Sequence, residues 1–95
     1  MTIKKYWFIV KAPDYNRIAD RMNLDSKSFS TTVIAVPSIE EAYLAADEMI
    51  KAGVEIIELC WWFGKEWYKK ISLHIKNKVP VGYVVFDDSK KTMLK

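Results

Sequence analysis

The chain has 95 residues, of which 51% are hydrophobic and 14% aromatic. This length suits one compact domain over residues 1–95, with more aromatic side chains than one small core needs, which is a first indication of self-association. Fifteen basic and twelve acidic residues give a formal net charge of +3 and are scattered along the chain. Such a distribution favours solubility, and without a nucleic-acid-binding motif it argues against a nucleic-acid partner.

Cys60 is the only cysteine and His74 the only histidine. An intrachain disulfide and a cysteine- or histidine-based metal cluster are therefore excluded, and we expect no metal site and a reducing compartment. The apolar run after Lys4 and Lys5 is too short for a signal peptide, and no run approaches the ~20 residues of a membrane span. We therefore predict a cytoplasmic protein with no membrane partner.

The first third of the chain predicts two strands. The run KYWFIVKAP is aromatic and β-branched, which predicts a strand over residues 6–12 that ends before Pro13. In the polar segment 14–28 the apolar residues are spaced so that a short helix is possible. The run STTVIAVP predicts a second strand over residues 31–36, which Pro37 ends.

A helix after the second strand is the best-specified element. Ser38 and Glu41 have the spacing of a capping box, and apolar residues then recur at helical spacing as far as Ile50. Gly53 is placed to end this helix in the left-handed conformation. The run VEIIELCW then predicts a third strand over residues 54–61.

The C-terminal third predicts one more helix and one more strand. After a break at Gly64, KEWYKKISLHI predicts a helix, VPVGYVVFD predicts a strand over residues 79–87, and residues 88–95 form a polar tail. The alternation implies right-handed crossovers with the last three strands parallel, and the apolar runs are typical of strands covered on both faces. We therefore predict an α/β fold: a small four-stranded, mainly parallel sheet of order β-(α)-β-α-β-α-β with helices packed on it.

In such a sheet, ligands bind beyond the carboxyl ends of the strands. The turn after the third strand carries the segment ELCWWFGKEW, with three of the four tryptophans and the only cysteine. If all four strands are parallel, their exit loops share one rim. The candidate ligand-binding residues there are Tyr15, Trp61, Trp62, Phe63, Gly64 and Asp87.

Glu58 and Cys60 are the candidate catalytic residues. Strand alternation places both on one face, with Glu58 buried beneath a helix or a neighbouring subunit. A buried carboxylate must be paired, hydrogen-bonded or protonated, so Glu58 is either a general acid or base or a structural partner of Lys11. Cys60 is either a nucleophile activated by a nearby cation or helix N-terminus, or a small buried hydrophobic residue.

The aromatic residues 61–63 cannot all point inward from one turn, so at least one should meet a ligand, a loop or another subunit. Gly64 permits a tight turn at the start of a helix, where a carboxylate or phosphate could bind. Asp87, at the end of the last strand, suits a hydroxyl or a divalent ion, or simply a turn or cap. No dinucleotide, Walker A or nucleophile-elbow motif is present in the sequence, so we expect no cofactor.

The chain resembles a family of short prokaryotic proteins of unknown function. In that family an Ile-Glu-Leu-Cys strand precedes a Phe-Gly turn, a tryptophan-bearing helix and a Val-Pro-Val-Gly strand. The matching positions are Glu58, Cys60, Phe63, Gly64, Trp67, Pro80 and Gly82. The tryptophans at 61 and 62 depart from the small residues expected there, and the resemblance brings no activity. A fainter similarity, of Gly53, Ile57 and Glu58 to a strand of small aldolase barrels, is fold-level analogy only.

Three functions follow as hypotheses. The first is a self-associating domain that binds a small anionic or carbonyl-bearing metabolite at the carboxyl ends of the strands. The second is a small lyase- or isomerase-like enzyme that uses Glu58 as general acid or base. The third is an oligomeric interaction module without catalysis.

Overall fold

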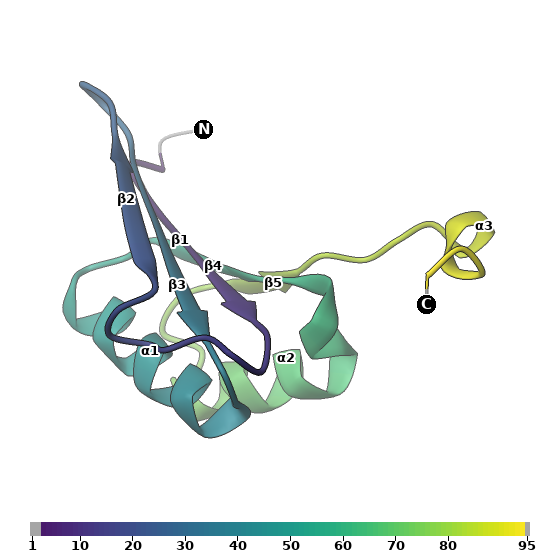
Figure 1. The fold of residues 1–95 in the computed structure, drawn as a ribbon. Coiled ribbons are helices and arrows are strands. Elements are labelled where there is room, and N and C mark those ends of the chain that lie inside the picture. Colours follow the sequence, from purple (N-terminus) through teal and green to yellow (C-terminus); the bar gives the residue numbers. More distant parts are fainter. Residues whose placement is uncertain (1–2, 95) are drawn as a thin grey trace.

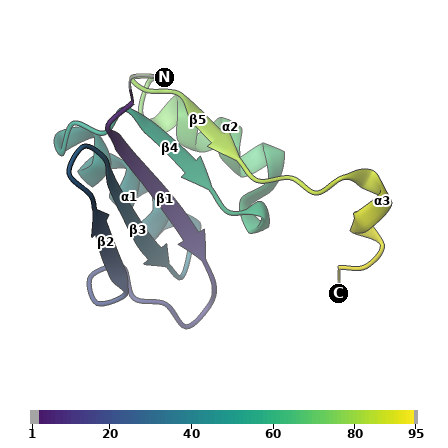
Figure 2. The same ribbon diagram turned by 90° about the horizontal axis from the view of Figure 1, so that it is seen from above.

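A computed structural model describes residues 3–94 and contains one five-stranded sheet in that range, in the order β2-β3-β1-β4-β5 (Figures 1 and 2). The elements in chain order are β1 (Lys5–Lys11), β2 (Arg21–Asp25), β3 (Ser30–Val36), α1 (Ile39–Lys51), β4 (Ile56–Leu59), the short 3₁₀ helix η1 (Trp61–Phe63), α2 (Gly64–His74), β5 (Val81–Tyr83) and α3 (Asp88–Lys91). Strands β1, β3, β4 and β5 are mutually parallel, and β2 is antiparallel to β3. The predicted α/β class with a mainly parallel sheet is confirmed, but the sheet has five strands rather than four.

The extra strand, β2, occupies the segment in which a short helix was considered, and that helix prediction was wrong. Residues 21–25 alternate polar and apolar side chains with a period of two, which suits a strand. A tight turn joins β2 to β3, closed by a hydrogen bond from the Ser26 amide to the Phe29 carbonyl at 2.8 Å. The residues before β2 form a turn in which the Asn16 side chain accepts hydrogen bonds from the Ile18 and Ala19 amides.

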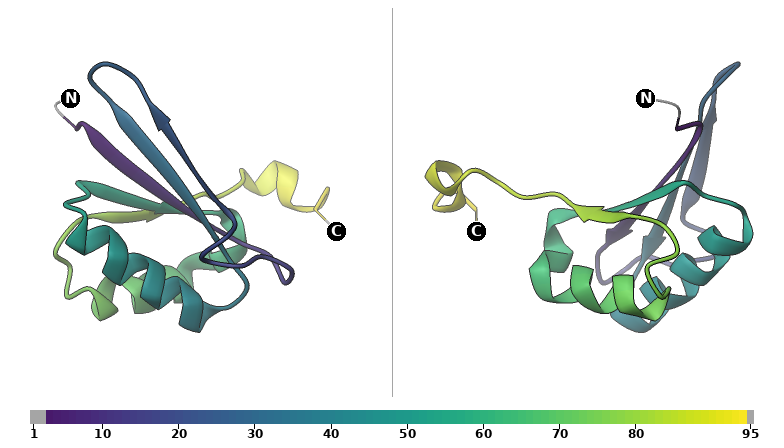
Figure 3. Two further views of the ribbon diagram at one scale, coloured as in Figure 1. Left: turned by 60° about the vertical axis from the view of Figure 1, so that its left-hand side comes forward. Right: turned by 180° about the vertical axis from the view of Figure 1, so that it is seen from behind.

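Both long helices lie on one face of the sheet (Figures 1 and 3). The connections β3-α1-β4 and β4-α2-β5 step in the same direction across the sheet, and crossovers of one hand then place both helices on the same side. The connection from β1 to β3 steps the other way, so a helix there would have covered the opposite face. Because β2 takes its place, no helix of residues 3–94 lies on that face, and within one chain the expectation of strands covered on both faces was wrong.

The core lies between the helices and the inward side of the sheet. Strand residues alternate, so Ile9, Ile34 and Leu59 point to the helices and are fully buried, where they pack with Met49 of α1 and Ile71 of α2. Fully burying one such side chain contributes about 1.5–3 kcal/mol relative to leaving it exposed. This packing fixes the carboxyl ends of β4 and β5 against the start of α2.

The helix boundaries follow local signals. The Ser38 hydroxyl oxygen accepts a hydrogen bond from the Glu41 amide at 3.3 Å and caps the start of α1, as the capping-box spacing predicts. Gly53 follows the end of α1 with φ +79°, and the Val54 amide donates back to the Met49 carbonyl.

The C-terminal segment differs from the sequence prediction. Strand β5 ends at Tyr83 rather than continuing to Asp87, and the following residues leave the sheet as an extended segment. Residues 84–94, which we call the arm, then form the single turn of α3 and project away from the rest of the molecule (Figures 1 and 2). The predicted polar tail therefore contains a short helix.

Candidate functional site

A cleft of about 480 Å³ lies at the carboxyl ends of β4 and β5, between the start of α2 and the arm. Its lining residues are Trp61, Gly64, Lys65, Tyr83, Val84, Val85, Phe86, Lys91 and Leu94. This is the end of the sheet at which parallel α/β folds bind ligands. The volume lies within the 300–1,000 Å³ range typical of small-molecule sites.

Aromatic side chains build one wall of the cleft. The rings of Trp61 and Trp62 stack with centroids 6.3 Å apart, and the rings of Trp61 and Phe86 lie at 75° to each other with centroids 5.9 Å apart. Trp61 and Trp62 are about half exposed, whereas Phe63 is buried in the core. The expectation that residues 61–63 cannot all point inward is confirmed, because η1 turns only the last of the three towards the helices.

The start of α2 forms the polar end of the cleft. Gly64 has φ +70° and ψ 176°, a conformation essentially restricted to glycine, which lets the chain turn sharply from η1 into α2. The first amides of a helix have no partner within the helix and carry its positive dipole end. Lys65 adds a cationic side chain from α2, and Lys91 adds one from α3 in the arm.

The two lysines differ in their surroundings. Lys91 forms an ion pair with Asp88 at 3.0 Å, and this hydrogen bond raises the pKa of Lys91. Within residues 3–94, Lys65 enters no ion pair. The first turn of α2 also carries Glu66, whose carboxylate pairs with Lys70 at 3.4 Å, so among the described residues the unpaired positive side chain at the cleft is that of Lys65.

Glu58 lies outside this cleft, on the face of the sheet opposite the helices. It is half-buried and sits in register with Phe8 of β1 and Gly82 of β5. Burial and the neighbouring Glu58 carboxylate together raise the pKa of the Tyr6 phenol to about 12. The possible ion pair with Lys11 does not form, because alternation along β1 places Lys11 on the other face, where its ammonium lies 5.3 Å from the Trp62 ring centroid.

Cys60 is buried and its sulfur has a structural role. The Lys11 amide donates a hydrogen bond to Cys60 Sγ at 3.4 Å, and the Cys60 amide donates to the Ile9 carbonyl at 3.1 Å. These contacts extend the pairing of β1 and β4 beyond their last ladder bond. A thiol held in this way is turned towards the backbone of β1 and does not line the cleft.

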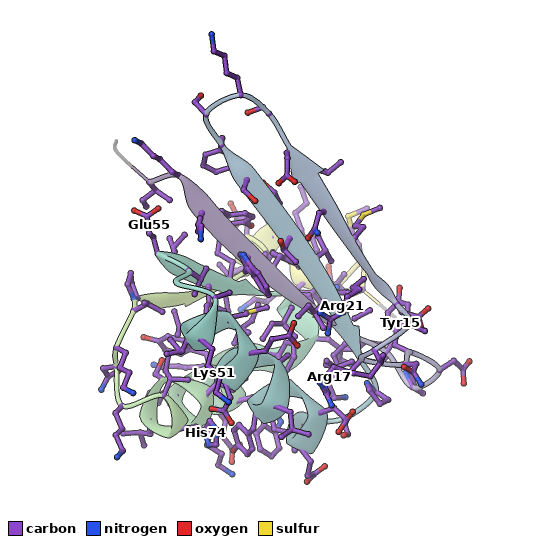
Figure 4. The ribbon with its side chains drawn as sticks, turned by 90° about the vertical axis from the view of Figure 1, so that its left-hand side faces the viewer. Tyr15, Arg17, Arg21, Lys51, Glu55 and His74 are labelled. Atoms are coloured by element: carbon purple, nitrogen blue, oxygen red, sulfur yellow. The ribbon has the colours of Figure 1, made fainter. Side chains whose placement is uncertain are left out.

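The remaining predicted site residues are separated from the cleft. Tyr15 lies in the loop after β1, near Arg17 and Arg21 on the β2 side of the molecule (Figure 4). Asp87 caps α3 through a hydrogen bond from the Ser89 amide at 3.1 Å, which matches the turn-or-cap alternative. Of the candidate binding residues, the structure thus brings together Trp61 and Gly64, with Trp62 stacked behind the first.

The sequence did not predict that residues at the end of β5 and in the arm line the cleft. Tyr83 packs its ring against Tyr68 of α2, with centroids 4.9 Å apart, and so holds the end of β5 beside the start of α2. Phe86 and Leu94 reach the cleft only because the chain leaves the sheet after Tyr83. The apolar run through residues 79–87 reads as one continuous strand, and no local signal marks its early end.

His74 serves to join the two helices. Its Nε2 lies 2.9 Å from the Asp47 carboxylate, and its ring stacks on Tyr43 with centroids 4.5 Å apart. In the described range no three His, Cys, Asp or Glu side chains gather closely enough to hold a metal ion. Likewise, none of the helices in residues 3–94 has the length and apolar character needed to cross a membrane.

A protein-family model described as a family of unknown function (DUF6506) matches residues 4–95. Because the match covers nearly the whole chain, the chain belongs to this family. The resemblance to a family of unknown function is thus confirmed, and the family brings no activity with it. Comparisons with curated proteins and with solved structures found no significant match.

Proposed function

We propose that this member of a family of unknown function binds a small ligand that combines a flat apolar body with an anionic group. One observation carries the proposal: the cleft at the carboxyl ends of β4 and β5 joins an aromatic wall to a cationic helix start. The ring of Trp61 would stack on the flat part of the ligand. The anionic group would lie at the first amides of α2, beside Lys65.

Charge and position support an anion over a cation at this site. Lys65 carries the uncompensated charge, and the positive end of the α2 dipole adds to it. The glycine at position 64 leaves open space, because a methyl group at that position would meet nothing within 4 Å. A ligand oxygen can therefore approach the backbone closely at this turn.

Nuclear magnetic resonance titration with two matched probes tests the proposal. The anionic probe is 2-naphthoate and the neutral probe is 2-naphthalenemethanol, which has the same rings without the charge. The chain has four tryptophans, at positions 7, 61, 62 and 67, so their indole N–H signals report four separate places. We expect 2-naphthoate to shift the Trp61 signal strongly and the Trp7 signal little.

Two lysine variants separate specific binding from general attraction. Lys65→Gln should weaken the binding of 2-naphthoate about two- to fivefold, the range of one exposed charge contact, and leave the neutral probe unaffected. Lys69→Gln, one turn further along α2 and outside the cleft, is the matched control. Equal effects of the two variants, or no shift at Trp61 with either probe, would refute the site.

A further inference from the structure

The face of the sheet opposite the helices is almost free of charge. Residues paired across the strands share a face, and the register assigns to this open face the side chains of Tyr6, Phe8, Val10, Met22, Leu24, Thr31, Val33, Ala35, Ile56, Glu58 and Gly82. Glu58 is the one charged residue among them. A soluble domain usually places polar side chains on the exposed face of a sheet, so this composition is typical of a covered surface.

We infer that the open face binds a second copy of the same chain, sheet against sheet. The resulting two-fold dimer would have four layers, with helices outside and the two sheets packed about 10 Å apart at the centre. This inference is independent of the ligand cleft, which opens at the start of α2 and not on the open face.

The charge pattern favours an identical partner. Burying a lone carboxylate at an interface is costly unless its hydrogen-bonding needs are met. The register places the Tyr6 phenol of the same chain beside Glu58 on this face, so the carboxylate has a polar neighbour and requires no basic residue from a different protein. The rest of the face is neutral, and a neutral apolar face is complementary to a copy of itself.

The size of the face determines what else a dimer must bury. Five strands about 4.8 Å apart and roughly 20 Å long give a flat area of about 400 Å², and the relief of the side chains increases the area that can be buried. A stable interface buries about 800 Å² on each partner, about twice that flat area, so side chains beyond the sheet must contribute as well. The arm offers such exposed apolar side chains outside the cleft, among them Met93. Association through the edge strands would form few backbone hydrogen bonds, since β5 has three residues and β2 has five.

The test measures mass in solution by light scattering over a dilution series, with the full chain. The double variant Met22→Lys/Leu24→Lys places two charges on the open face, where these side chains are 57% and 62% exposed in one chain. The matched control is Leu73→Lys, a 70% exposed leucine on α2. We expect a dimer for the natural sequence and for the control, and a dissociation constant raised at least about 100-fold for the double variant.

Three results would overturn the inference: a monomer at every concentration, a dimer unaffected by the double variant, or equal weakening by Leu73→Lys. A second measurement needs no variant. In a mixture of isotope-labelled and unlabelled protein, intermolecular contacts should appear at the Met22 and Leu24 methyl groups. Contacts at Leu73 in their place would move the interface to α2 and contradict the proposal.

Discussion

The phenol of Tyr6 and the carboxylate of Glu58 are neighbours on the open face of the sheet, on the adjacent strands β1 and β4. This arrangement gives Glu58 a polar neighbour without a cation. It also raises the pKa of the phenol, since burial and the nearby negative charge both favour the protonated form.

The Tyr6 phenol should ionise at a pH above the ordinary range of a phenol. Its pKa is about 12 in the folded chain against an ordinary value of 10, so its contribution to stability is complete below pH 10 and is lost as the pH rises towards 12. Tyrosinate absorbance should show a late-titrating phenol that Tyr6→Phe removes and Glu58→Gln shifts to lower pH. An unchanged titration curve in both variants would contradict the pairing.

Low pH should weaken the ion pair between Arg21 of β2 and Glu48 of α1. Arg21 Nη2 donates to Glu48 Oε1 at 3.0 Å, and this hydrogen bond lowers the pKa of Glu48 below its ordinary value of 4.5. A lowered folded pKa means that the stabilisation is present above the unfolded pKa and is lost as the pH falls through the folded pKa. The melting temperature of Glu48→Gln should therefore depend less on pH below about 4.5 than that of the natural sequence. Glu40→Gln, in the exposed first turn of α1, is the control, because it removes one carboxylate and leaves the contact between Arg21 and Glu48 in place.

Cys60 should react slowly with thiol reagents in the folded protein. Its sulfur is buried and accepts the Lys11 amide, so reagents reach it only after local or global unfolding. Cys60→Ala removes that acceptor and should lower the free energy of unfolding by about 1–3 kcal/mol. A disulfide-exchange assay in buffer and in denaturant measures the first effect. Fast labelling of the folded chain would instead identify a reactive thiolate and revive the nucleophile hypothesis.

Gly64 should tolerate no side chain, although space is available. The barrier is the backbone conformation at φ +70° and ψ 176°, so Gly64→Ala should cost about 1–3 kcal/mol in urea denaturation. Gly82→Ala is a suitable comparison, because Gly82 has no positive φ and a new methyl group would meet only Glu58 Cγ, at 4.0 Å. Equal losses in the two variants would show that the conformation at residue 64 is not the cause.

Local patterns predicted most of the fold. The Ser38 cap, the strand runs and Gly53 act over a few residues, and α1, β1 and β3 lie within a residue or two of the predicted bounds. The alternation of polar and apolar residues over 21–25 predicts the strand β2. The apolar residues of the segment 14–28 are also spaced as in a helix, so the two patterns predict different structures there.

The candidate site was harder to predict because it depends on relations between distant segments. Strand alternation correctly separates the face of Glu58 from that of Leu59, but the sequence does not say which face the helices cover. That depends on the direction of each crossover, and the loss of one helix leaves Glu58 on the open side. The contribution of Phe86 and Lys91 to the cleft depends on where β5 ends, which tertiary packing around Tyr83 decides.

The central position of β1 has a consequence for folding. Strand β1 is made first, yet both its neighbours come later in the chain: Lys5 pairs with Ser30, and Tyr6 pairs with Ile56. Of the four strand pairings in residues 3–94, only the β2-β3 hairpin joins segments that follow one another through a tight turn. Non-local pairings require long loops to close before they stabilise anything, so the hairpin should form early and β1 should enter the sheet late. During synthesis the aromatic residues of β1 therefore remain unpaired until β3 has been made. The second edge of β1 remains unpaired until β4 has been made.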